Sequence, residues 1–200
     1  MKNLLLNTKS LFQETSFFIL RFFTGLMMCY YHGWSKLLSD SSRWERLGNS
    51  LTQWIGFDSL KITFGFMAAF SESIGAILIA VGLLTRPATI LLMITMIVAM
   101  VSVHAENGWL AIADASSWLA DGTILLNESV MEAPDKLAAA KSLLQEHGHY
   151  DWLTSSGNFV VLNNGIEFGA TYFVMLLVLF FYGGGRYVSV DHFFTKRELS

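Results

Sequence analysis

Arg21 and Glu72 each lie inside a long apolar stretch of the sequence. An ionised side chain is unfavourable there, so each residue indicates either a structural ion pair or a functional site. Arg21 is the only charge in the stretch 15–32, and Glu72 lies near the middle of the stretch 62–84. Inside a bilayer each charge costs about 2.5–3.5 kcal/mol on insertion scales. The two residues are at similar distances from the ends of their stretches, so we expect similar depths. The spacing allows an ion pair that fixes helix register or, equally, a pair that handles protons or binds a ligand.

A second group of polar residues lies where apolar stretches end. His32 ends one stretch and His104 another, Glu167 begins a third, and Lys36 follows His32 by one helical turn. Histidine titrates near neutral pH and suits proton transfer, so the group predicts binding of a quinone head group. Haem ligation by the two histidines and simple hydrogen bonding at the membrane surface remain open alternatives. The ligand types would also suit a metal, but nothing in the spacing requires one, and we predict none.

The composition points to a lipid environment for these residues. The 200-residue chain is 53% hydrophobic and 14% charged, with a mean hydropathy of +0.46, whereas soluble domains carry about 25% charged residues. The net charge of −3 and the lack of a basic stripe exclude nucleic acid as an expected partner. Cys29 is the single cysteine, which rules out an intrachain disulfide.

Four stretches approach the roughly 20 apolar residues that a spanning helix needs. They predict an all-α fold, an integral membrane four-helix bundle forming one domain, with spans at about 15–32, 62–84, 87–104 and 166–182. Pro87 begins the third span directly after the second, so these two form an antiparallel hairpin. An extramembrane insert at about 105–165 contains a short helix that Pro134 opens and Gly148 closes.

Charge and tryptophan distribution predict the orientation of the bundle. Lysines and arginines near helix ends in short segments place both termini in the cytoplasm and both long loops outside. All six tryptophans lie in those loops: Trp34, Trp44, Trp54, Trp109, Trp118 and Trp152. They either anchor the loops at the membrane surface, which we favour, or belong to an ordered cap.

The order of these residues resembles the DoxX family. The residues that carry the resemblance are Arg21, Gly25, His32-Gly33, Lys36, Glu72, Gly75, Gly82–Arg86, His104, Glu167, Gly183–Arg186 and Asp191. The resemblance implies a multi-pass protein of the bacterial cytoplasmic (inner) membrane. Family members have been linked to quinone-dependent oxidation as small membrane subunits, while the insert is larger than usual for the family.

We therefore expect a redox-associated, quinone-interacting subunit of an oxidoreductase in contact with the bilayer. In this interpretation Glu72 and Arg21 are catalytic, and the head group meets His32, Lys36, His104 and Glu167. A redox partner protein or a second copy of the chain would assemble with it. The alternatives are a non-catalytic scaffold that recruits a partner through its outer loops, and a small-solute transporter.

Overall fold

The structure, a computed structural model, describes residues 2–198, with side chains for residues 11–53 and 55–194. The described chain forms two compact units. One comprises residues 1–102 and 170–200, and the other comprises residues 103–169. No strand occurs between residues 2 and 198, so the predicted all-α class is confirmed.

The first unit begins with a long helical rod. Its α-helix α1 (Lys2–Met27) continues into a π-helical segment, η1 (Met28–Gly33), and then into α2 (Trp34–Leu37). A π-helix inserts one extra residue into a turn and is uncommon. The rod therefore continues several residues beyond the predicted end of the first span.

The second rod forms the predicted hairpin with the third. It comprises the 3-10 turn η2 (Asp58–Leu60), α4 (Lys61–Phe70), the π-helical η3 (Ser71–Gly75) and α5 (Ala76–Val81). Gly82 ends it at a φ of 70°, a left-handed conformation that glycine adopts without strain. The third rod comprises α6 (Thr85–Ala99), the π-helical η4 (Met100–His104) and the 3-10 turn η5 (Ala105–Asn107).

Among the described residues, two helices are long and apolar enough to cross a bilayer. They are Asp58–Val81, with 24 residues, and Thr85–Asn107, with 23 residues. The helix α10 (Glu167–Tyr182) is apolar but shorter, with 16 residues. The second and third predicted spans thus match long apolar helices, and the four-span bundle stays a prediction.

The first long loop contains a helix, α3 (Ser41–Ile55), that the sequence analysis missed. The Asp40 side chain caps it by accepting a hydrogen bond from the Arg43 backbone N–H at 3.1 Å, and Gly56 ends it with a φ of 80°. It packs against α4 so closely that a methyl group on Gly48 would strike the Lys61 carbonyl. The two helices form a tight hairpin, since a methyl group on Gly65 would likewise strike the Trp44 backbone.

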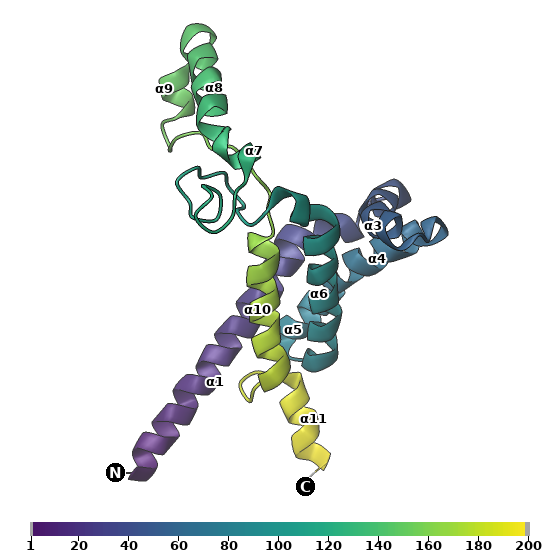
Figure 1. Ribbon diagram of the computed structural model, residues 1–200. Coiled ribbons are helices and arrows are strands. Elements are labelled where there is room, and N and C mark those ends of the chain that lie inside the picture. The colour runs from purple at the N-terminus through teal and green to yellow at the C-terminus, as the bar shows by residue number, and fades with distance from the viewer. Residues whose placement is uncertain (1, 199–200) are drawn as a thin grey trace. The chain divides into compact units, whose positions relative to one another are not determined.

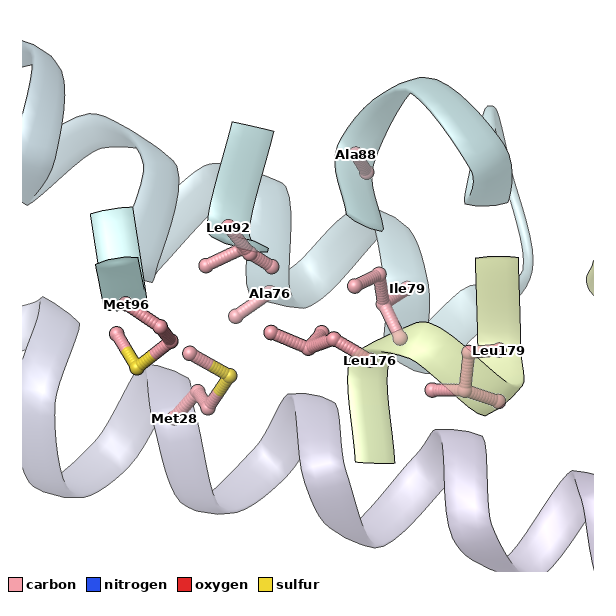
Figure 2. Packing of buried hydrophobic residues seen from close by; sticks show 8 residues of the cluster. All are labelled: Met28, Ala76, Ile79, Ala88, Leu92, Met96, Leu176 and Leu179. Atoms are coloured by element: carbon pink, nitrogen blue, oxygen red, sulfur yellow. The ribbon is translucent and has the colours of Figure 1, made fainter. Parts of the chain in front are cut away.

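Figure 1 shows the ribbons of α5 and α6 side by side, and the core of the first unit is a cluster of apolar side chains between the rods. Figure 2 shows Met28 of the first rod and Met96 of the third with their sulfur atoms near each other, beside Leu92. Leu176 and Leu179 of α10 extend the same cluster. The C-terminal helix α11 (Val190–Glu198) follows α10 after a short glycine-rich linker.

The second unit consists of short helices and loops. Its helices are α7 (Glu128–Met131), α8 (Ala133–His147) and α9 (Tyr150–Leu153), with two isolated β-bridges, Ile112 to Leu162 and Asp121 to Leu126. Pro134 lies in the first turn of α8, and Gly148 follows its last residue. The predicted short helix of the insert is therefore confirmed.

Candidate functional site

Glu72 forms a direct ion pair with Lys36. The Glu72 side chain is only 5% exposed and the Lys36 side chain 22%, so the pair is largely removed from solvent. Glu72 lies in η3 and Lys36 in α2. The two segments can approach each other because Gly33 has no side chain, and even a methyl group there would strike the Glu72 backbone. A close glycine contact between the two rods thus positions the carboxylate and the ammonium group.

His32 and Tyr172 complete a group that we name the Glu72 cluster: His32, Lys36, Glu72 and Tyr172. The His32 ring is half-buried, and both Glu72 and Lys36 act on it electrostatically. Its edge meets the Tyr172 ring of α10, with the centroids 5.4 Å apart. The cluster therefore combines a carboxylate, an ammonium group, an imidazole and a phenol, which together can donate, accept and transfer protons.

His32, Glu72 and His104 each lie in a π-helical segment of their rod. Among the described residues, the three π-helical segments each contain one of the ionisable residues singled out above: His32 in η1, Glu72 in η3 and His104 in η4. Short π segments inside α-helices occur frequently at functional sites, because the extra residue redirects side chains. Where η1 meets η3, this redirection contributes to bringing His32 and Glu72 into one cluster.

Arg21 lies in a different place from Glu72. Its side chain is fully buried, and its Nη2 donates hydrogen bonds to the carbonyl oxygens of Tyr187 at 3.0 Å and Val188 at 3.3 Å. Its guanidinium also lies over the Phe18 ring, 5.5 Å from the centroid. Arg21 therefore ties the segment before α11 to the first rod.

The segment before α11 also binds the hairpin between the second and third rods. Ser189 donates its hydroxyl to the Gly82 carbonyl at 3.2 Å. The Asp191 carboxylate accepts the backbone N–H groups of Leu84 at 2.8 Å and Thr85 at 3.0 Å, which caps α6. We name these contacts the Arg21 clamp: Arg21, Gly82, Ser189 and Asp191.

The expected ion pair between Arg21 and Glu72 is wrong, and the register of the rods explains why. Gly33 packs on the Glu72 backbone, Gly25 on Ala76 and Ala80, and Arg21 on Gly82. Gly82 lies ten residues beyond Glu72, a distance of about 15 Å along a helix. The prediction assumed that the outer ends of the first two spans lie at the same depth. Instead, the outer part of the second rod, α4, packs mainly against α3 and much less against the first rod.

Apolar packing also separates the two polar groups. Met28, Ala76 and Ile79 are fully buried between the level of Glu72 and the level of Gly82. The side chains drawn in Figure 2 form this layer. This apolar layer lies between the two polar groups, and Arg21 contacts the segment before α11 instead of the Glu72 cluster.

His104 and Glu167 belong to the second unit and bond to its backbone. The Nδ1 atom of His104 lies 2.9 Å from the Asn164 carbonyl oxygen. The Glu167 carboxylate accepts the backbone N–H of Ala111 at 2.9 Å. These bonds hold the two ends of the insert together, and the predicted contact of both residues with a quinone head group stays a prediction.

Sequence reasoning missed Tyr172, Ser189 and the capping role of Asp191. Tyr172 is five residues after Glu167 and reads as one more aromatic residue of an apolar helix. A signal existed for Asp191, because its carboxylate stands at the start of a polar segment that follows the glycine run, and aspartate is a residue type that caps helices. Within residues 11–53 and 55–194 no group of three or more metal-ligating side chains gathers.

Comparison with known proteins identifies the segment that holds this site. The model of the DoxX family matches residues 16–105, somewhat less than half of the chain. Over this segment the chain is similar to the DoxX family. No curated protein and no solved structure matches it.

The DoxX segment contains most of the Glu72 cluster. It includes His32, Lys36, Glu72 and Arg21, and it ends one residue after His104. Tyr172, Glu167 and the remainder of the Arg21 clamp lie beyond it. The match to the DoxX family and the two long apolar helices together support a membrane protein. The bacterial inner membrane and the number and direction of crossings remain predictions.

Proposed function

We propose that this protein is a redox-associated membrane subunit that binds the head group of a quinone at the Glu72 cluster. The observation that carries the proposal is the buried ion pair between Lys36 and Glu72, with His32 and Tyr172 beside it. A buried ion pair adds little net stability in comparison with apolar packing. Its presence within an apolar bundle therefore favours a functional role over a purely structural one.

The four side chains could both bind a quinone and supply protons for its reduction. The N–H groups of Lys36 and His32 and the Tyr172 hydroxyl can donate to quinone carbonyl oxygens. Reduction to the hydroquinone adds two electrons and two protons, and Glu72 and His32 are the groups able to pass protons. The electrons would come from a redox partner protein, so the chain acts as a subunit of an oxidoreductase.

The test measures quinone bound to the purified protein. The chain is expressed in a quinone-containing membrane, purified in mild detergent, and extracted for mass spectrometry. We expect stoichiometric quinone with the wild type, and its loss with Glu72→Gln. The matched control is Glu45→Gln, which removes a surface carboxylate paired with Lys61 at 2.9 Å. Absence of quinone from the wild type, or equal quinone in Glu72→Gln, would overturn the proposal.

A second candidate function is a scaffold that recruits a partner through the second unit. This unit holds nine carboxylates and two lysines, a formal charge of −7 in a chain whose total is −3. The loop 114–126 of this unit also exposes three large apolar side chains: Trp118 (69% exposed), Ile124 (63%) and Leu126 (65%). An acidic surface with exposed apolar side chains suits a basic partner protein. A stoichiometric partner that survives Glu72→Gln and is lost with Trp118→Ser would favour this function.

A further inference from the structure

A half-open apolar groove of about 180 Å³ lies between α3, α4 and α6. Leu47 and Gly48 of α3 form one wall, Ala68 of α4 forms the floor, and Leu91 and Val98 of α6 form the other wall. Both α4 and α6 belong to the two helices that are long enough to cross a bilayer. In a bilayer, an apolar groove beside such helices takes up a hydrocarbon chain more readily than water.

One hydrogen bond connects the groove lining to the segment that holds Glu72. Thr95 lines it, and the Thr95 hydroxyl lies 2.7 Å from the hydroxyl of Ser71, the residue before Glu72. Ser71 is buried and also donates to the Ala68 carbonyl at 3.0 Å. The same π-helical segment thus contacts a residue of the groove lining through Ser71 and contacts Lys36 through Glu72.

The wall formed by α3 is also connected to Lys36. The Trp44 indole N–H donates to the Lys36 carbonyl at 2.8 Å. Trp44 is held against α4 by the contact with Gly65 and by its ring contact with Phe66, 5.0 Å between centroids. A chain lying in the groove therefore packs on the helix that positions Lys36.

We propose that this groove binds the prenyl tail of the quinone whose head group meets the Glu72 cluster. The inference rests on the proposed function and adds the tail site to it. A tail in lipid gains little from leaving other hydrocarbon, so the preference arises from close packing against the groove walls. The groove thereby selects long-tailed quinones over tailless ones and tightens α3 around Lys36.

The experiment compares a tailless quinone with a long-tailed prenyl quinone, titrated into the purified full chain in nanodiscs. The groove variant is Val98→Phe, which fills the groove from α6. Its matched control is Val101→Phe, because Val101 is 46% exposed and does not line the groove. Thermal melting of both variants without added quinone shows that each is folded.

We expect the wild type and Val101→Phe to bind the long-tailed quinone more tightly than the tailless one. Val98→Phe should weaken binding of the long-tailed quinone about tenfold, as size discrimination in apolar pockets commonly does, and leave the tailless quinone unchanged. Glu72→Gln should weaken both, which separates the head-group site from the tail site.

Three outcomes would overturn the inference. Equal affinity for both quinones, or an unchanged Val98→Phe, would remove the tail site while the head-group site stands. Binding of neither quinone to the wild type would reject the proposed function and the tail site together. A phospholipid seen by native mass spectrometry, lost in Val98→Phe and not displaced by quinone, would assign the groove to an acyl chain instead.

Discussion

At the scale of single residues, the buried pair of Lys36 and Glu72 has an asymmetric response to substitution. Lys36→Met leaves the Glu72 carboxylate buried without its counter-charge and should lower the free energy of unfolding by about 3 kcal/mol. Glu72→Gln keeps the shape and the hydrogen-bonding capacity of the side chain and should cost less. The double variant should recover much of the loss, because no unpaired charge remains.

Thermal unfolding in detergent measures this cycle. The matched control is the pair of Lys61 and Glu45, whose side chains are 34% and 46% exposed. The corresponding variants Lys61→Met and Glu45→Gln should each change stability by less than about 1 kcal/mol. Additive effects at Lys36 and Glu72 would contradict a direct coupling between them.

Substitution of Arg21 should affect stability and not quinone binding, because Arg21 contacts backbone carbonyl groups and not the Glu72 cluster. Arg21→Met should lower stability by about 2–4 kcal/mol, since it releases two carbonyl groups from a buried guanidinium. Hydrogen exchange should rise in the segment 183–191, while quinone content stays unchanged.

A nearby arginine serves as the control for Arg21. Arg86 donates a single exposed bond to the Phe181 carbonyl at 3.3 Å, so Arg86→Met should leave exchange in the segment 183–191 nearly unchanged. If Arg21→Met removed bound quinone without changing exchange there, Arg21 would belong to the ligand site after all.

At the scale of elements, glycine sets the distance between the first and second rods. A methyl group on Gly25 would strike the Ala76 carbonyl, and the atoms it meets are backbone atoms that cannot turn aside. Gly25→Ala should therefore destabilise the protein by about 1–3 kcal/mol and loosen the Glu72 cluster. Gly75→Ala is the control, because its new methyl group would meet Leu92 at an ordinary 3.7 Å.

Circular dichroism melts of the two glycine variants give the comparison. Gly75→Ala should be neutral or slightly stabilising, since alanine has the higher helix propensity. Equal melting temperatures for Gly25→Ala and Gly75→Ala would show that the rods do not depend on the close approach at Gly25.

Two aspartates give the loop 114–126 of the second unit an expected pH dependence. The Ser116 hydroxyl lowers the pKa of Asp114, and the Thr123 backbone N–H lowers the pKa of Asp121. Because the folded pKa is depressed, the stabilisation is complete above the ordinary value of about 3.9. It is lost as the pH falls through the folded pKa.

An acid titration of Trp118 fluorescence, taken as the difference between wild type and Trp118→Phe, follows this loop. The signal should be constant at neutral pH and change below about pH 4. In the variant Asp114→Asn with Asp121→Asn, which keeps oxygen acceptors but does not titrate, this change should be absent. A change that persists in the variant would place its origin outside these two aspartates.

The helices were more predictable than their register. Apolar length located the second and third rods, and the sequence pattern of Pro134 and Gly148 located α8, because both signals are local. The pairing of Glu72 with Lys36 rather than Arg21 depends on which glycines meet across the rods, and composition does not contain that information. Helix α3 was missed because its tryptophans suggested a membrane surface, although Asp40 and Gly56 have the residue types that begin and end a helix.

At the scale of the whole molecule, the predicted topology depends on the distribution of charge and on the length of α10. The second unit carries a formal charge of −7, and the rest of the chain carries eleven basic and seven acidic residues, or +4. Orientation follows the lysines and arginines of short segments near helix ends, and those at the two termini favour the termini in the cytoplasm and the second unit outside. However, α10 has 16 residues, about 24 Å of helix, against a hydrocarbon core of about 30 Å. A fourth crossing therefore needs the residues that flank α10.

Two engineered cysteines in a Cys29→Ser background test this topology. Thr123→Cys lies in the loop of the second unit, and Arg186→Cys follows α10; both native side chains are exposed. In intact cells a membrane-impermeant maleimide should label Thr123→Cys, and it should label Arg186→Cys only after permeabilisation. The reverse pattern would invert the orientation. Labelling of both sites from the same side would mean that α10 does not cross, which leaves Tyr172 and the Glu72 cluster at the membrane surface instead of within a four-helix bundle.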